Sequence, residues 1–317
     1  MSNFIYYALG TFGFIGLFYG GNILVKGTVQ TARSLNIPAH LIAITIVALG
    51  TSAPELVVSI NAVFKGSPDL AWGNVVGSNI ANLLLVIGGA SLFITLKDES
   101  KSLRLDIFWM ILSTIIIFIF GYYYQGLSPF IGFLLILTLI FILILMTLST
   151  EKNEDFHDDN NSNNYFSPVI VGLFFTIGGI AIVLISSEIL INSAIKISID
   201  LGIEESLIGV TIVALGTSLP EIAASVAAAR KGYADIAIGN VLGSNLFNSL
   251  GILGAASIVS YPVDLQTPST FLGYDLPIMM LVTIILGAYL FYFKSINRKF
   301  GPFLLLLYMV YILINFA

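Results

Sequence analysis

The sequence predicts an all-α integral membrane protein in which ten transmembrane helices form two inverted-topology repeats of five. The chain is 57% hydrophobic and only 10% charged, whereas soluble domains average about 25% charged residues. Its apolar runs are long and apolar on every face, which excludes the short alternating strands of a membrane barrel. Residues 43–91 also recur as residues 209–257, with 27 identities in 49 ungapped positions.

Ten apolar segments can be drawn as spanning helices along the chain. They cover residues 4–33, 40–64, 69–94, 105–122, 127–149, 167–197, 206–229, 235–259, 272–293 and 301–316. No basic flank precedes the first segment, so we expect a spanning helix there rather than a cleaved signal peptide. The sequence contains no cysteine, which excludes disulfides and thiol chemistry.

The basic residues predict the orientation of these segments. If successive segments cross in alternating directions, eleven lysines and arginines fall on one side and two, Lys65 and Lys196, on the other. The richer side is expected to be cytoplasmic, which places the protein in the cell membrane with both termini extracytoplasmic. The eleven are Lys26, Arg33, Lys97, Lys101, Arg104, Lys152, Arg230, Lys231, Lys294, Arg298 and Lys299.

The chain divides at its one long polar segment. Residues 1–150 form the first repeat, helices one to five, and residues 167–317 form the second repeat, helices six to ten. Between them, residues 151–166 form an acidic cytoplasmic linker, which accounts for most of the net charge of −5. A calcium-sensing loop is the alternative for this segment, but the glycine and closing glutamate of an EF-hand loop are missing. No nucleic-acid or protein partner is implied.

Two polar motifs interrupt the apolar runs, and each occurs twice. GTSAPE at 50–55 recurs as GTSLPE at 216–221, and GNVVGSNIAN at 73–82 recurs as GNVLGSNLFN at 239–248. Equivalent helices are five spans apart, and because five is odd the two copies cross the membrane in opposite directions. Inverted repeats in secondary transporters place the substrate site near the membrane midplane, between broken helices.

Within residues 41–64, 70–92, 206–229 and 236–259, the four helices of the duplicated region contain only two ionisable residues, Glu55 and Glu221. A charge at the centre of a membrane costs at least about 2.5 kcal/mol. Each carboxylate therefore needs either a proton or a bound cation to neutralise it.

The surroundings of the two acids favour a cation. Pro54 and Pro220 have no N–H, so the carbonyls of Gly50 and Gly216 lose their helical partners. The kinks should also loosen neighbouring carbonyls, namely those of Ala48, Thr51, Ala214 and Thr217. Hydroxyls share a helix face with each acid, and a row of amides and hydroxyls lies on the partner helices. These residues are Thr51, Ser52, Asn74, Ser78 and Asn82, with Thr217, Ser218, Asn240, Ser244 and Asn248 in the second repeat. Carboxylate, amide, hydroxyl and carbonyl oxygens suit Ca²⁺ and Na⁺ rather than zinc or copper.

Each of these residues also has a purely structural interpretation. The hydroxyls could bond back to their own helices, and the two asparagines that end the rows could join helices as hydrogen-bonding contacts. The glycine pairs of the second motif, at 73 and 77 and at 239 and 243, are typical of close helix packing. Glu188 is expected at the membrane interface. For the two glutamates, recurrence in the same kinked context argues against protonated acids without function.

The two motif pairs resemble the alpha-repeats of the sodium/calcium exchangers, within the cation/calcium antiporter superfamily. The resemblance covers both repeats and the ten-helix layout. It implies Na⁺-driven, electrogenic Ca²⁺ transport, with the long first and sixth helices sliding past a fixed core. Some prokaryotic relatives carry Asp at the position of Asn248, a departure that bears on stoichiometry and proton sensitivity. The implied ion-site residues are Ala48, Thr51, Ser52, Glu55, Ser78 and Asn82, with Ala214, Thr217, Ser218, Glu221, Ser244 and Asn248.

The sequence therefore predicts an antiporter that exchanges cytoplasmic Ca²⁺ for external Na⁺ by alternating access, without a cofactor. Glu55 and Glu221 would bridge one Ca²⁺, assisted by the carbonyls of Thr51 and Thr217. A Ca²⁺/H⁺ antiporter is the alternative. A channel is disfavoured because inverted repeats favour rocking over a continuous pore. An intramembrane protease is disfavoured because the chain lacks a paired-aspartate site and a His-Glu-x-x-His motif.

Overall fold

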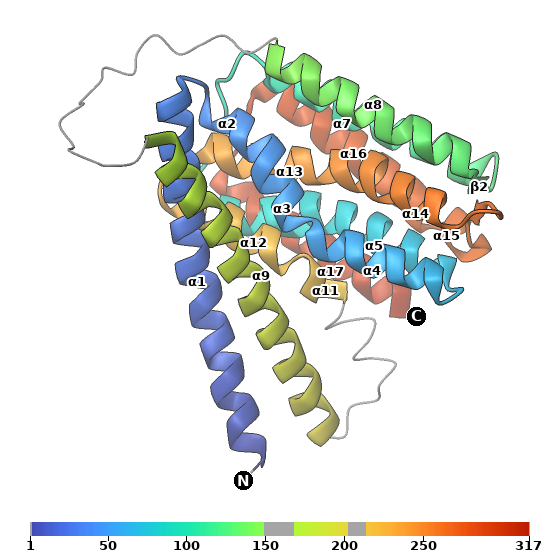
Figure 1. Cartoon of the computed structure of the whole chain (residues 1–317), viewed down its shortest axis with the longest axis horizontal. Helices are drawn as coiled ribbons and strands as arrows, with labels where there is room; N and C mark the ends of the chain where they lie inside the picture. Colours follow the sequence, from blue (N-terminus) through green and yellow to red (C-terminus); the bar gives the residue numbers. More distant parts are fainter. Residues whose placement is uncertain (1, 149–167, 202–213, 317) are drawn as a thin grey trace.

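The computed structural model describes residues 2–148, 168–201 and 214–316, which are almost entirely helical (Figure 1). The predicted linker at 151–166 and the first residues of the predicted segment 206–229 lie outside the described residues.

The first half begins with a helix of 34 residues and continues with shorter, interrupted helices. In chain order its elements are α1 (Ser2–Leu35), α2 (Ala39–Ile42), the π-helix η1 (Ala43–Val47), α3 (Ala48–Thr51), α4 (Ala53–Phe64), α5 (Pro68–Ala81), the π-helix η2 (Asn82–Val86), α6 (Ile87–Ser91), β1 (Leu96–Lys97), α7 (Leu103–Tyr122), β2 (Gly126–Leu127) and α8 (Pro129–Leu148).

The elements of the second half follow a similar order, with short helices at Ser269–Gly273 and Arg298–Phe300 that the described residues of the first half lack. In chain order the elements are α9 (Pro168–Asp200), α11 (Ala214–Thr217), α12 (Leu219–Arg230), α13 (Ala234–Leu246), the π-helix η4 (Phe247–Ile252), α14 (Leu253–Val259), β3 (Leu265–Gln266), α15 (Ser269–Gly273), α16 (Asp275–Phe293), β4 (Ser295–Ile296), the 3₁₀-helix η5 (Arg298–Phe300) and α17 (Gly301–Phe316).

Within the described residues, seven helices are long and apolar enough to cross a membrane. An eighth span results if the bent pair Ala39–Thr51 and Ala53–Phe64 is counted as one. The prediction of an all-helical membrane protein is thus confirmed. The count of ten stays a prediction, because α17 has only 16 residues and the segment 206–229 begins outside the described part of the chain.

The two long helices α1 and α9 pack side by side in opposite directions (Figure 1). Glycines let their backbones touch: a Cβ added to Gly27 would lie 2.2 Å from the backbone nitrogen of Thr176, and one added to Gly179 would lie 2.4 Å from that of Leu24. Small residues at such positions allow close helix packing, which is the main attraction between helices in lipid. Together the two helices form a layer that contacts the remaining bundle chiefly through α12.

The centre of the protein is built from the two helices that carry the GSN motifs. Of the most apolar stretch of Ala234–Val259, 94% is buried, and of Pro68–Ser91, 72%, whereas the other candidate spans are only 28–39% buried. Trp72 of the first central helix is completely buried, as is Met110 of the neighbouring α7. The surrounding spans keep broad apolar faces exposed, as expected for helices in contact with lipid.

Two short antiparallel ribbons tie the halves together. Strand β1 pairs with β4, with Leu96 opposite Ile296, and β2 pairs with β3, with Leu127 opposite Leu265. Each ribbon therefore takes one strand from each half. The four leucine and isoleucine side chains are fully or almost fully buried, so the ribbons are anchored by apolar contacts as well as by backbone hydrogen bonds.

Candidate ion-binding site

Both proline motifs break their helices at the serine. The backbone leaves α-helical geometry at Ser52 (φ −82°, ψ 7°) and at Ser218 (φ −84°, ψ 0°), the sparsely populated region that active-site residues often occupy. The first break bends the helix by 41°. Pro54 and Pro220 lie in the first turn of the following helix, where a missing N–H is tolerated. The predicted kinks are therefore present in both repeats.

The carbonyls near the kinks are not all free. The Gly216 carbonyl, which Pro220 deprives of its helical donor, accepts a hydrogen bond from Ser187 Oγ of α9 at 3.2 Å. The Ala48 carbonyl accepts from Ser52 N–H at 3.0 Å and from Thr51 Oγ1 at 3.3 Å. The prediction of a loosened Ala48 carbonyl is thus wrong for this conformation, because the first helix keeps its hydrogen bonds up to the break.

The two glutamates lie in the buried centre and belong to one polar cluster. Glu55 is 1% exposed and Glu221 0% exposed. Ser52 Oγ donates across the repeats to Glu221 Oε1 at 3.1 Å, and Ser244 Oγ donates to the same oxygen at 3.4 Å. Glu55 lies close enough to Glu221 for the two carboxyl groups to interact electrostatically. The break in one repeat therefore brings its hydroxyl directly to the acid of the other.

Several buried polar atoms of this cluster have no hydrogen-bond partner among the described residues. Leaving a buried acceptor unpaired costs about 1–3 kcal/mol, and more when it is charged. The unpartnered oxygens are Glu55 Oε1, Glu55 Oε2, Glu221 Oε2, Ser218 Oγ, Asn82 Oδ1 and Asn248 Oδ1. All are hard oxygen atoms of the kind that coordinate Ca²⁺ and Na⁺. The residues present therefore fit a transported cation of this class.

Asn74 and Asn240 hold the broken helices in place. Asn74 Nδ2 donates to Ser59 Oγ and to the Glu55 carbonyl, both at 2.9 Å, and Asn240 Nδ2 donates to Ser225 Oγ at 3.1 Å. These bonds occupy equivalent positions in the two repeats. Their amides are engaged in positioning the helices. The two serines, Ser59 and Ser225, are not among the residues predicted from the sequence.

A second pair of asparagines was also missed. Asn79 and Asn245 are 1% exposed, and Asn245 Nδ2 approaches the Asn79 carbonyl at 3.4 Å. Asn82 Nδ2 donates to Asn245 Oδ1 at 3.0 Å, and Asn79 Nδ2 donates to Ser249 Oγ at 3.0 Å. The signal was the full GSN triplet, whose asparagine lies one position away from the row of ligand candidates. The interhelical role considered for Asn82 is thus real, and its Oδ1 is still unpartnered.

The helices widen where the asparagine rows end. Asn82 is the first residue of η2, and Asn248 lies within η4. The π-helix is rare, and single π-helical turns within α-helices are frequently found at functional sites. The same irregularity therefore appears in both repeats beside the acidic cluster.

The remaining candidates lie on the short helices beside the kinks or on the central helices. Ala48 and Thr51 are fully buried in α3, Thr217 is buried in α11, and Ser78 is buried in α5. Ala214 begins α11, and its side chain lies outside the described residues. Within the described part of the chain, no group of three or more His, Cys, Asp or Glu is arranged to hold a metal ion. The site has two acids, and its other donors are neutral.

A model of the sodium/calcium exchanger protein family matches residues 5–148 and 171–317. The chain belongs to the sodium/calcium exchanger family. Like the relatives that carry that name, this family member is a multi-helix membrane protein and a cation/calcium antiporter.

Individual relatives match this family member over nearly its whole length. It is 34% identical over 311 residues to the putative antiporter CaxA of Alkalimonas amylolytica, covering 94% of this chain and 95% of the relative. It is 29% identical over 343 residues to the sodium/calcium exchanger MaX1 of Methanosarcina acetivorans, covering 96% of each chain. Its fold superimposes on that of the sodium-calcium exchanger NCX_Mj, whose structure was solved after soaking with Na⁺, with a TM-score of 0.84. The two sequences are 29% identical, and the match covers 97% of this chain and 98% of NCX_Mj.

Proposed function

We propose that the protein expels cytoplasmic Ca²⁺ in exchange for external Na⁺ by alternating access. The observation that carries this proposal is the pair of buried glutamates from opposite halves, joined through Ser52 and with three carboxylate oxygens unpartnered. Two carboxylates balance the charge of one Ca²⁺, and an uncompensated pair in this environment would be strongly unfavourable.

The ion sites would use the same set of oxygens for both ions. Glu55 and Glu221 would bridge one Ca²⁺ with the carbonyls of Thr51 and Thr217. Na⁺ ions would occupy hydroxyl, amide and carbonyl oxygens on either side, and competition for the carboxylates would couple the two fluxes. The proposed ligand set is Ala48, Thr51, Ser52, Glu55, Ser78, Asn82, Ala214, Thr217, Ser218, Glu221, Ser244 and Asn248.

Two features support the inverted arrangement of repeats. The helices α1 and α9 begin 166 residues apart, at Ser2 and Pro168, and run antiparallel. The ribbons join β1 with β4 and β2 with β3, so the first strand of each half pairs with the second strand of the other. A two-fold axis in the membrane plane would produce both features. With ten spans in this arrangement, both termini would be extracytoplasmic.

The layer formed by α1 and α9 is the element that would move relative to the rest of the bundle during transport. Its two helices pack on each other through glycines, and they contact the rest of the bundle over a smaller surface, chiefly at α12. A shift of this layer along the central helices would open the acidic cluster to one side of the membrane at a time, as alternating access requires.

The driving ion can be decided by flux measurements. Purified protein in liposomes would take up ⁴⁵Ca²⁺ under separately imposed Na⁺, K⁺ and H⁺ gradients, with Glu55→Gln/Glu221→Gln liposomes as the leak control. We expect an outward Na⁺ gradient at constant pH to drive uptake, because the amides of Asn82 and Asn248 cannot carry a proton. Uptake that follows the pH gradient and ignores Na⁺ would instead establish the Ca²⁺/H⁺ antiporter.

A further inference from the structure

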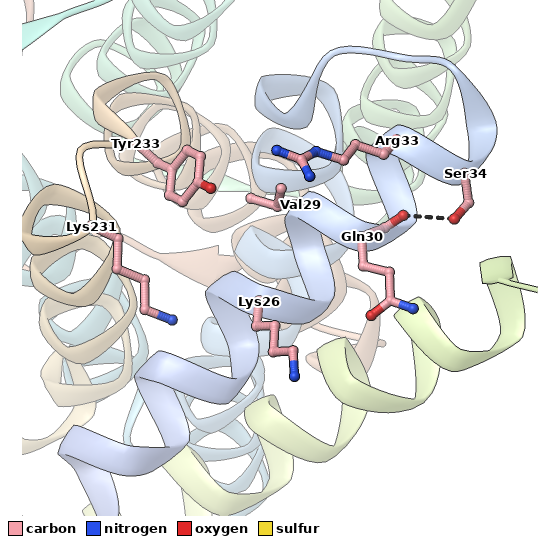
Figure 2. A pocket seen from close by; sticks show the side chains of 7 residues that line it. All are labelled: Lys26, Val29, Gln30, Arg33, Ser34, Lys231 and Tyr233. Atoms are coloured by element: carbon pink, nitrogen blue, oxygen red, sulfur yellow. Dashed lines mark hydrogen bonds between the residues drawn. The ribbon is translucent and has the colours of Figure 1, made fainter. Parts of the chain in front are cut away.

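A cavity lined by basic residues lies between α1 and the turn that joins α12 to α13. It has a volume of about 420 Å³, and its lining residues are Lys26, Val29, Gln30, Arg33, Ser34, Lys231 and Tyr233. Figure 2 shows Lys26, Gln30 and Arg33 projecting from successive turns of one helix, with Lys231 and Tyr233 approaching from the facing turn. None of these described lining residues is acidic, so the cavity carries concentrated positive charge.

The positive charges of the two lysines that line this cavity, Lys26 and Lys231, repel each other. Partial burial, and then the charge of Lys26, lower the pKa of Lys231. Lys231 Nζ nevertheless reaches α1, where it donates to the Asn22 carbonyl at 2.6 Å. An anion between the two ammonium groups would relieve this repulsion and add charge-assisted hydrogen bonds.

An apolar crevice lies next to the basic cavity, between α1 and α12. Asn22, whose carbonyl binds Lys231, and Arg230, the residue before Lys231, both line it. The crevice has a volume of about 310 Å³ and is otherwise apolar. The guanidinium of Arg230 lies 4.6 Å from the Phe18 ring centre. The apolar lining of the crevice includes Leu17 of α1 and Leu219 and Ala223 of α12.

We propose that these two cavities together bind one anionic phospholipid, with its phosphate in the basic cavity and an acyl chain in the crevice between α1 and α12. The order of the cavities agrees with the predicted orientation. Lys26 and Arg33 lie in the last third of α1 and Lys231 directly follows α12, toward the predicted cytoplasmic side, whereas the crevice is lined by earlier residues of both helices. Basic pockets between spanning helices on the cytoplasmic side are suited to anionic headgroups. A free phosphate would satisfy the basic cavity but leave the crevice unused, so the geometry favours the lipid.

The proposal can be tested by binding, without ion transport. Detergent-purified full-length protein would be titrated with phosphatidylglycerol, phosphatidylcholine or inorganic phosphate, followed by native mass spectrometry and thermal unfolding. We expect phosphatidylglycerol to be retained and to raise Tm, and the other two to have little effect. Inorganic phosphate protecting equally would show a free-anion site, and phosphatidylcholine protecting equally would show that charge plays no part. Either result overturns the proposal.

Variants assign the effect to the two cavities. Lys26→Gln/Lys231→Gln should weaken phosphatidylglycerol binding on the order of 30-fold, since each basic residue contributes roughly 1 kcal/mol to binding an anionic surface. The control Lys97→Gln/Lys299→Gln removes the same charge from exposed positions and should leave binding unchanged. Ala223→Leu, which fills the crevice, should weaken lipid binding and leave the Tm of the lipid-free protein unchanged. Unchanged affinity in the double lysine variant would overturn the assignment.

Discussion

At the scale of single residues, the two glutamates are equivalent in sequence but differ in their surroundings. Glu221 accepts hydrogen bonds from Ser52 and Ser244, whereas neither carboxylate oxygen of Glu55 has a protein partner among the described residues. The same serines and glutamates occur at equivalent positions in both repeats. We therefore attribute this asymmetry to the particular conformation of the structure. It leaves Glu55 dependent on a cation or a proton.

Replacing either acid should abolish Ca²⁺ transport. Glu55→Gln or Glu221→Gln halves the charge available to a divalent ion, and we expect Ca²⁺ affinity to fall by more than the roughly 10–100-fold that follows loss of an outer-shell partner. Thermal stability should change little, because a buried acid becomes a neutral amide of similar shape. The measurements are ⁴⁵Ca²⁺ flux and Tm, with Asp69→Asn, an exposed acid, as the control. Transport at near the wild-type rate in either variant would refute the shared site.

Asn248 should determine how the exchange responds to protons. It is fully buried, and neither of its side-chain polar atoms has a hydrogen-bond partner among the described residues. Asn248→Asp would add a third carboxylate to a cluster of two, and because like charges crowded together favour protonation, Ca²⁺ uptake should become more sensitive to mild acid than in the wild type. The measurement is Na⁺-driven uptake across a pH series. An unchanged pH profile would mean that Asn248 lies outside the coupled cluster.

At the scale of elements, the packing of α1 on α9 requires glycine only on the face of α9 that meets α1. A Cβ at Gly179 would lie 2.4 Å from the Leu24 backbone nitrogen, whereas one at Gly178 meets no described atom within 4 Å. Gly179→Ala should therefore force the helices apart, at a cost of about 1–3 kcal/mol, and slow transport. Gly178→Ala, a change of the same size one residue away, should be neutral or slightly stabilising. Tm and flux of the two variants provide the comparison, and equal behaviour would argue against a close seam.

Outside the ion site, the buried His40 of α2 forms ion pairs with Asp98, directly after β1, and with Asp106 of α7. Asp98 Oδ2 lies 3.1 Å from His40 Nδ1, and His40 Nε2 contacts Asp106 Oδ2 at 2.8 Å. Burial alone would raise the pKa of Asp98, but the charge of the nearby His40, helped by the hydrogen bond that Ser100 N–H donates, lowers this pKa below its ordinary value. Asp98 is therefore stabilising when ionised. That contribution is present above its unfolded-state pKa and is lost as the pH falls through the folded-state value.

The pair predicts a pH-dependent loss of stability. Asp98→Asn should lower Tm at neutral pH on the order of 5 °C or more, because it breaks a buried ion pair. The difference from the wild type should begin to shrink below about pH 4, near the unfolded-state pKa. It should disappear only once the pH has fallen below the lower folded-state pKa, where the native carboxylate is protonated as well. Glu99→Gln, which removes the neighbouring exposed partner of Lys97, should have little effect at any pH. A difference that persists unchanged into acid would contradict the ion pair.

At the scale of the whole molecule, the inverted topology makes a prediction about equivalent turns. Lys65 and Lys231 are 166 residues apart, and each precedes a glycine with positive φ, Gly66 (72°) and Gly232 (85°). The turns have the same local geometry, yet the repeat requires them on opposite faces of the membrane. In this cysteine-free chain, Lys65→Cys should react with an impermeant thiol reagent only from outside and Lys231→Cys only from the cytoplasm. Labelling of both from one face would exclude inverted repeats.

Much of this molecule could be predicted without coordinates. The apolar composition requires helices, because every backbone polar group in lipid needs a partner within its own segment. The proline motifs predicted breaks that the structure places at Ser52 and Ser218. The two acids were found because an ionisable residue in an apolar helix is costly and therefore conspicuous. These are local properties, which depend on the residue and its near neighbours in the chain.

The tertiary structure alone decided which polar groups meet. Nothing in the sequence shows that Ser52 bonds to Glu221, that Asn245 contacts Asn79, or that His40 pairs with Asp98. The ion site, the α1–α9 seam and the basic cavity likewise arise where segments distant in the chain are packed together. Such contacts depend on the rotation and depth of each helix, which are set by close packing between whole elements rather than by the spacing of residues within one.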